Sequence, residues 1–121
     1  MEEPFREKET TLILLLRKFD FLRNNGYNII ELTLHGTETY IVYKKIRINQ
    51  TIYIKWAPRN FLKIRISRTN IFRYKEVNLN DIYRLYSDKN SSLTLKSMSD
   101  VIEAYSTFVK NQLMPVIKGE A

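Results

Sequence analysis

Side chains that commonly perform acid–base or nucleophilic chemistry are scarce in this chain. His35 is the only histidine, and the chain contains no cysteine. His35 lies near Glu31 and Glu38, but a lone histidine in a strand next to a turn is more often a surface residue than a general base. The three glycines are far apart in sequence and form no phosphate-binding loop. We therefore expect a protein that is not an enzyme and that binds no metal or cofactor.

Basic and tyrosine side chains are the more informative set. In "FLKIRISR" (residues 61–68), Leu62, Ile64 and Ile66 alternate with polar or basic residues, which places the two kinds on opposite faces of a strand. If the even-numbered apolar residues of neighbouring strands also point inward, the opposite sheet face is basic and carries tyrosine. The predicted face consists of Tyr43, Lys45, Arg47, Tyr53, Lys55, Lys63, Arg65, Arg73 and Lys75.

Such a face has several interpretations. It could dock on an acidic protein surface, with Arg47, Tyr53, Lys55, Lys63 and Arg65 at the centre of the interface. It could bind RNA, because cations neutralise phosphates and flat rings stack on unpaired bases. It could also be a solvated surface that discourages edge pairing. Small metal-independent ribonuclease toxins use Arg, Lys and Tyr on a basic sheet, but their chains usually open with a strand and a helical pair. An acidic protein is favoured over nucleic acid.

The charge of the chain is concentrated in one segment. The net charge is +7, and no Asp or Glu occurs between Thr39 and Lys75, whereas the same segment holds ten basic residues. Outside it, acidic residues outnumber basic ones. This distribution favours an anionic partner.

The first and last parts of the chain have helical periodicity. Apolar residues in 4–24 follow the i, i+3, i+4, i+7 spacing of one buried stripe, and "NNG" (residues 24–26) predicts a left-handed stop. A second long helix is expected after "SMSD" (residues 97–100), with Pro115 ending or kinking it. A short helix is predicted at 78–86, followed by a polar loop at 87–97.

Between the helices the period falls to two. Strands are expected from residue 27 to 35, 39 to 49, 50 to 56, 61 to 67 and 71 to 77, with Val42, Ile46 and Ile48 inward in the second. Short turns between them predict an antiparallel meander.

We therefore predict one α+β domain over residues 1–121, with a four- to five-stranded antiparallel sheet covered on one face by an N-terminal and a C-terminal helix. The expected core contains Leu12, Leu16, Phe19, Ile54, Ile64, Phe108 and Val109. The chain has no apolar run of membrane-spanning length, so we expect no membrane association and a cytoplasmic location.

The order of these elements resembles that of a set of small bacterial α+β proteins. The resemblance rests on five segments of the sequence, namely "FDFLRNNGY" (19–27), "TYIVYKKIRINQTIYIKW" (39–56), "NFLKIRISR" (60–68), "NLNDIYRL" (78–85) and "VIEAYSTFVKNQLMPVIKGE" (101–120). Several such proteins resemble immunity proteins of polymorphic and contact-dependent toxin systems. The resemblance implies a cognate toxin domain as partner and gives no binding residue. Immunity proteins against nuclease toxins are usually acidic, so a basic member implies an acidic toxin surface or a toxin of another kind.

Overall fold

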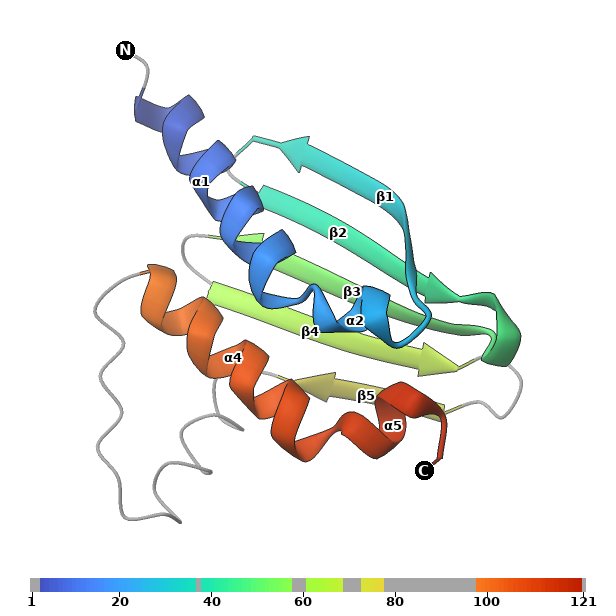
Figure 1. Ribbon diagram of the computed structural model, residues 1–121. Coiled ribbons are helices and arrows are strands. Elements are labelled where there is room, and N and C mark those ends of the chain that lie inside the picture. Colours follow the sequence, from blue (N-terminus) through green and yellow to red (C-terminus); the bar gives the residue numbers. More distant parts are fainter. Residues whose placement is uncertain (1–2, 37, 58–60, 69–72, 78–97, 121) are drawn as a thin grey trace, which may run out of the picture.

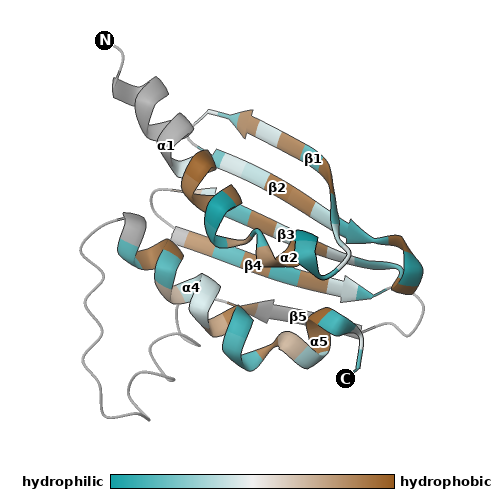
Figure 2. Cartoon of the chain, in the orientation of Figure 1, coloured by the Kyte–Doolittle hydropathy of each residue, from teal (hydrophilic) through white to brown (hydrophobic). Residues whose placement is uncertain are grey.

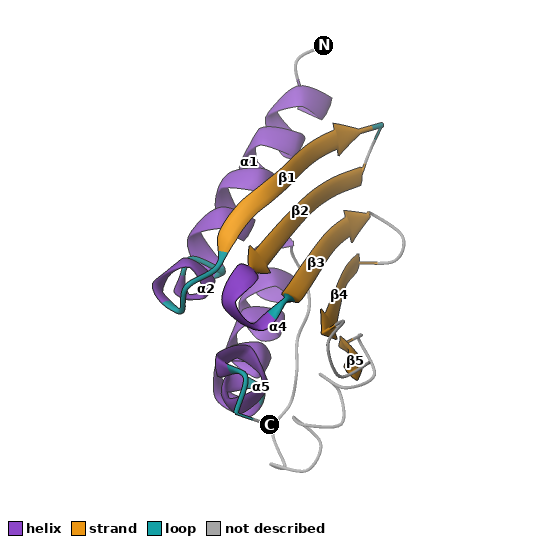
Figure 3. Ribbon diagram, turned by 90° about the vertical axis from the view of Figure 1, so that its right-hand side faces the viewer, coloured by secondary structure: helices purple, strands orange, loops and turns teal. Residues whose placement is uncertain are grey.

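The protein is a five-stranded antiparallel sheet with helices packed on one of its faces (Figures 1 and 3). The computed structural model describes residues 3–36, 38–57, 61–68, 73–77 and 98–120. The elements are α1 (Glu3–Lys18), α2 (Phe21–Asn24), β1 (Asn28–His35), β2 (Glu38–Lys45), the 3-10 turn η1 (Ile46–Ile48), β3 (Gln50–Ala57), β4 (Phe61–Arg68), β5 (Arg73–Val77), α4 (Met98–Gln112) and α5 (Met114–Lys118). The strands lie in the order β1-β2-β3-β4-β5, so the predicted α+β meander is confirmed. The helix expected at 78–86 and the loop at 87–97 lie outside the described residues.

Both predicted long helices are interrupted near their C-terminal ends. The first stops at Lys18 and resumes as the single turn α2, after which Gly26 adopts a φ of +92°, a value that glycine reaches without strain. The second stops at Gln112, and Pro115 lies in the first turn of α5. Proline is tolerated there because the first helical N–H groups have no acceptor within the helix.

The core lies between the helices and the sheet face that they cover, which we call the inner face. Of the predicted core residues, Phe19, Ile54, Ile64 and Val109 are buried. Leu12, Leu16 and Phe108 are partly buried and pack against the same cluster. The alternation of apolar and polar residues along β3 and β4 is visible in Figure 2.

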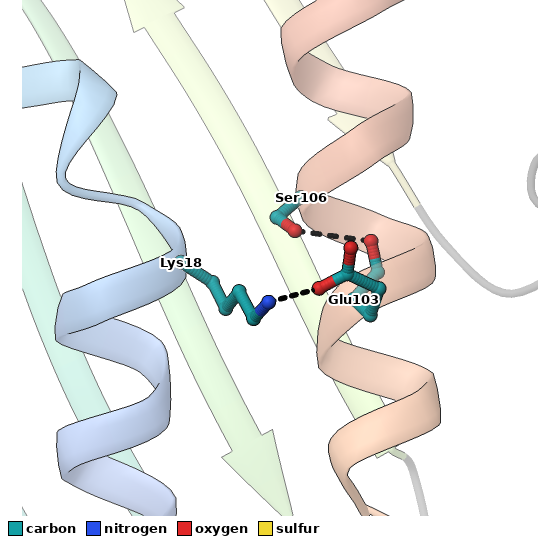
Figure 4. Close-up of polar contacts among 3 residues, drawn as sticks. All are labelled: Lys18, Glu103 and Ser106. Atoms are coloured by element: carbon teal, nitrogen blue, oxygen red, sulfur yellow. Dashed lines mark hydrogen bonds and ion pairs between the residues drawn. The ribbon is translucent and has the colours of Figure 1, made fainter.

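An ion pair joins the two long helices. The Lys18 ammonium of α1 contacts the Glu103 carboxylate of α4, and the Ser106 hydroxyl donates a hydrogen bond of 3.0 Å to the Glu103 carbonyl (Figure 4). More than a third of each charged side chain is exposed, so the pair contributes at most about 1 kcal/mol. Apolar packing is therefore the main force that holds α1 and α4 on the sheet.

The lengths of the hairpin loops decide which residues face the core. His35 pairs with Glu38, and Lys45 pairs with Gln50, so both loops contain an even number of residues. Paired residues of neighbouring strands point to the same side of a sheet. Across a loop with an even number of residues, an odd-numbered residue pairs with an even-numbered one, so the face given by odd numbers in one strand is given by even numbers in the next. The loop between Ala57 and Phe61 has three residues, so even-numbered residues of β3 pair with even-numbered residues of β4 and the same face keeps even numbers in both strands.

The predicted orientation of β2 is consequently wrong. Ile41 and Tyr43 are buried opposite Ile54 and Ile52 of β3, whereas Val42 lies on the other face. Ile46 and Ile48 belong to η1 and not to a strand, and Asn49 closes that turn with a φ of +51°.

A buried polar cluster attaches α5 to the sheet. The Gln50 amide donates hydrogen bonds to the Tyr27 hydroxyl (2.6 Å) and to the Val116 carbonyl (2.9 Å), while the Tyr27 hydroxyl donates to the Ile117 carbonyl (2.7 Å). The Arg68 guanidinium reaches the Gly119 carbonyl at 3.3 Å. These bonds fix the C-terminal turn against the ends of β3 and β4.

Gln50→Leu is expected to lower the free energy of unfolding by about 1–3 kcal/mol, because it removes the donor of one buried and one partly buried hydrogen bond and leaves the Val116 carbonyl without that partner. Urea unfolding measures the change. Thr51→Ala, at the adjacent half-exposed position, is the control and should change stability by less than about 0.5 kcal/mol. An equal effect of the two substitutions would contradict the role given to this cluster.

Candidate binding surface

The sheet face opposite the helices carries the candidate site, and we call it the outer face. Hydrogen-bonded register places its residues in three rows across β2, β3 and β4. The rows are Tyr40–Lys55–Lys63, Val42–Tyr53–Arg65 and Lys44–Thr51–Ser67. All described helices lie on the other side of the sheet (Figure 3).

Tyr53 and Arg65 form the centre of this face. The Arg65 guanidinium carbon lies 5.8 Å from the centroid of the Tyr53 ring, within the range of a cation–π attraction. Tyr53 keeps 40% of its surface exposed, and both Lys63 and Arg65 are exposed. A large ring held by a neighbouring cation loses little further conformational entropy when a partner covers it.

Lys55 belongs to a second cluster beside this centre. Its ammonium lies 5.5 Å from the centroid of the Tyr40 ring and 3.6 Å from a Glu38 carboxylate oxygen. The Tyr40 hydroxyl donates a 2.9 Å hydrogen bond to the other Glu38 oxygen. The interaction with Tyr40 raises the pKa of Lys55, and the Glu38 charge adds to the rise, so Lys55 is a fixed cation at neutral pH.

Acidic side chains border the basic centre on its β1 and β2 side. Glu31 is exposed on β1, in the row of Tyr53 and Arg65, and Glu38 begins β2. The outer face therefore has a positive centre on β3 and β4 and a mixed margin at β1. A surface of mixed sign is typical of protein recognition, where opposite charges on the partner fix the orientation of docking.

Four of the predicted site residues lie together on this face: Tyr53, Lys55, Lys63 and Arg65. Tyr40 and Lys44 also belong to it and were not predicted. The even-numbered loops on either side of β2 are the sequence signal that could have found them, since they place the even residues of β2 outward.

The other predicted site residues lie elsewhere. Tyr43 is fully buried on the inner face. Lys45 lies on the inner side, with its ammonium 5.8 Å from the centroid of the Tyr27 ring. Arg47 is exposed in η1, beyond the end of the strands. In β5 the backbone of Arg73 pairs with Arg68, and that of Lys75 with Ile66, not with outer-face residues. The four differences in the strands, at Tyr43, Lys45, Arg73 and Lys75, arise because the loops that set the register of β2 and β5 contain an even number of residues.

The pKa of Tyr43 is raised to about 12, mainly by burial and to a smaller extent by the Asp20 carboxylate, while Arg23 opposes the change. The unfolded chain releases this proton near pH 10. Between pH 10 and pH 12 the folded state therefore keeps the Tyr43 proton while the unfolded chain has lost it. The contribution of Tyr43 to the free energy of unfolding, about 2–3 kcal/mol, is present below pH 10 and is lost as the pH rises to 12.

Tyr43→Phe should change stability little at pH 7, because the Tyr43 hydroxyl has no hydrogen-bond partner among the described residues. The variant should lose less stability than the wild type between pH 10 and pH 12, as measured by urea unfolding across that range. An identical pH profile for the two proteins would contradict the burial of this hydroxyl.

His35 is exposed at the end of β1, opposite Glu38 in the ladder. The described part of the chain contains no group of three or more His, Asp or Glu side chains that could hold a metal ion. None of the described helices is both long enough and apolar enough to cross a membrane.

Comparisons with protein-family models, with curated proteins and with solved structures find no match to this chain.

Proposed function

We propose that the chain is a non-enzymatic binding protein whose outer face docks on an acidic protein surface. The observation that supports this most directly is the Tyr53–Arg65 pair, exposed at the centre of the face with Lys55 and Lys63 on the neighbouring row. Tyr and Arg are the residue types that most often dominate binding energy, because they bury a large area and also form hydrogen bonds. The surrounding lysines would steer an acidic partner toward them.

A protein partner fits this face better than RNA does. One side of the Tyr53 ring is occupied by Arg65, and the Tyr40 ring is occupied by Lys55, so neither is an open platform for a base. Glu31 and Glu38 would repel a phosphate backbone at the margin of the face. An acidic protein can instead place its own cations beside these two carboxylates.

The partner that we propose is a cognate toxin domain, with the chain acting in the cytoplasm as an immunity protein that covers the active site of the toxin. The element order on which this resemblance rests is helix, antiparallel sheet, helix, as in the structure. The basic centre requires a toxin with an acidic docking surface. An immunity protein acts by affinity alone, which agrees with a surface composed of cations and aromatic rings.

Co-expression with the toxin domain expected from the neighbouring gene tests this proposal. Growth should be rescued by the wild type and by His35→Ala, but not by the folded triple variant Lys55→Glu, Lys63→Glu, Arg65→Glu. The matched control reverses three exposed cations of the helices, Arg17, Lys110 and Lys118, and should still rescue growth. Rescue by the outer-face variant would place the interface elsewhere. Toxicity of the protein expressed alone would reject immunity and favour a ribonuclease.

An oligonucleotide titration tests the alternative of RNA binding. Single-stranded RNA should bind weakly at about 50 mM salt and undetectably at about 200 mM, because few phosphates would be neutralised and counterion release would be small. Tight binding at low salt that is lost on reversal of Lys63 and Arg65 would establish the outer face as an RNA-binding surface.

A further inference from the structure

The two edges of the sheet differ in how they are protected. Strand edges carry unpaired backbone groups, and proteins usually guard them with Lys, Arg, Pro or bulges. The β5 sequence includes Arg73 and Lys75, whereas β1 contains no Lys, Arg or Pro. Three large apolar side chains of β1 are exposed, namely Ile30 (57%), Leu32 (44%) and Leu34 (43%). Among the described strands, β1 pairs on one side only (Figure 1).

A bulge limits the part of β1 that is available for pairing. The register with β2 shifts between Ile29 and Glu31, so Ile30 is the extra residue. The remaining regular segment runs from residue 31 to 35. Leu32 and Leu34 share the inner side with their partners Ile41 and Thr39, and the other residues of the segment belong to the outer side. The segment thus has an apolar row and a polar row, with Thr33 at its midpoint.

We propose that this segment pairs antiparallel with the same segment of a second copy, about a two-fold axis that passes through Thr33 perpendicular to the sheet. A symmetric interface places each contact twice. In this register Leu32 of each copy lies opposite Leu34 of the other, on the inner side. Glu31 lies opposite His35 of the second copy on the outer side, and Thr33 meets its own symmetry mate. Apolar pairs, Thr–Thr pairs and pairs of complementary charge all stabilise neighbouring strands.

Other two-fold registers fit less well. An axis through Glu31 opposes two carboxylates, which is destabilising. An axis through Leu32 pairs Glu31 with Thr33 and extends into the bulge at Ile30. An axis through Leu34 pairs Leu34 with its own symmetry mate but leaves Leu32 opposite Gly36, so Leu32 has no apolar partner. The axis through Thr33 alone pairs the two leucines with each other and the carboxylate with the imidazole.

The proposed dimer is a continuous sheet with five strands from each copy. Because the axis is perpendicular to the sheet, the helices of both copies lie on one side and both outer faces on the other. The proposal does not depend on the proposed function, since β1 and the basic centre are separate surfaces. It would place two basic centres on one surface, separated by β1 and β2 of both copies.

Sedimentation equilibrium at up to about 1 mM protein, a concentration that detects weak association, should show a dimer. His35→Glu opposes carboxylates at two symmetric positions and should weaken association at least about tenfold. Adding Glu31→Lys to that variant places opposite charges at the two symmetric positions and should recover the dimer. A monomeric wild type, or failure of the second substitution to recover association, would overturn the proposal.

Cysteine cross-linking tests the register itself, because the chain has no natural cysteine. Thr33→Cys should form a disulfide-linked dimer on mild oxidation, since paired Cβ atoms in antiparallel strands lie about 4.5–5.5 Å apart. His35→Cys is the matched control and should stay monomeric on a non-reducing gel, because its symmetry mate lies four pairs away and beyond disulfide reach. Equal cross-linking of both variants, or of neither, would contradict the axis through Thr33.

Discussion

Ile64→Ala is expected to lower the free energy of unfolding by about 2–5 kcal/mol. Ile64 is fully buried in the central part of the sheet, opposite Ile54 of β3 and Val77 of β5. The substitution removes three methyl or methylene carbons from a site with neighbours on both strands and on the helices. The surrounding side chains cannot close the cavity completely, so lost packing adds to the lost hydrophobic transfer free energy.

Urea denaturation followed by circular dichroism measures this change. Lys63→Ala is the matched control, because Lys63 is the adjacent residue on the same strand, exposed on the opposite face. It should alter stability by less than about 0.5 kcal/mol. A loss of less than about 1 kcal/mol for Ile64→Ala, or similar losses for both variants, would contradict the assignment of the inner face.

Arg65→Glu is expected to weaken binding of the proposed toxin partner by about 2–5 kcal/mol, which is roughly 30- to 5,000-fold in Kd. Arg65 packs on Tyr53 at the centre of the outer face, where a partner would exclude water from both side chains. Reversal would remove the cation from the Tyr53 ring and place a carboxylate against an acidic surface. Because the charge would be buried in the complex, the main effect should be faster dissociation.

Lys55→Glu should act differently, since the half-exposed Lys55 lies beside Glu38 at the margin of the face. A charge at the rim of an interface mainly changes the rate of association and its dependence on salt. Surface plasmon resonance at two salt concentrations separates the two effects. Arg17→Glu on the exposed side of α1 is the control and should leave both rates unchanged. Unchanged kinetics for Arg65→Glu would place the interface elsewhere.

The sequence predicted the fold and the inner face of β3 and β4 correctly. In these strands Ile52, Ile54, Ile64 and Ile66 alternate strictly with polar residues, and the three-residue loop preserves the parity. Alternation alone was sufficient there, because every apolar residue at an even position is also a core residue.

The same reasoning failed in β2 because the sequence is apolar on both faces. Ile41, Val42 and Tyr43 are consecutive and all buried, so hydrophobicity could not distinguish the faces. Only the register of the two flanking hairpins fixes the orientation. That register depends on η1, where "IRI" has the composition of a strand but forms a turn closed by Asn49 in the left-handed region. Tyr43, Lys45 and Arg47 were misplaced as a result, whereas Arg73 was misplaced by the separate loop between β4 and β5.

Lysine acetylation of the protein, free and in complex with the proposed toxin domain, tests the central claim most directly. The outer face carries Lys44, Lys55 and Lys63, whereas Lys110 and Lys118 are exposed on α4 and α5. Mass spectrometry should show that complex formation protects Lys55 and Lys63 while Lys110 and Lys118 keep their reactivity. Protection of Lys110 and Lys118, with Lys55 and Lys63 unchanged, would contradict the assignment of the outer face as the interface.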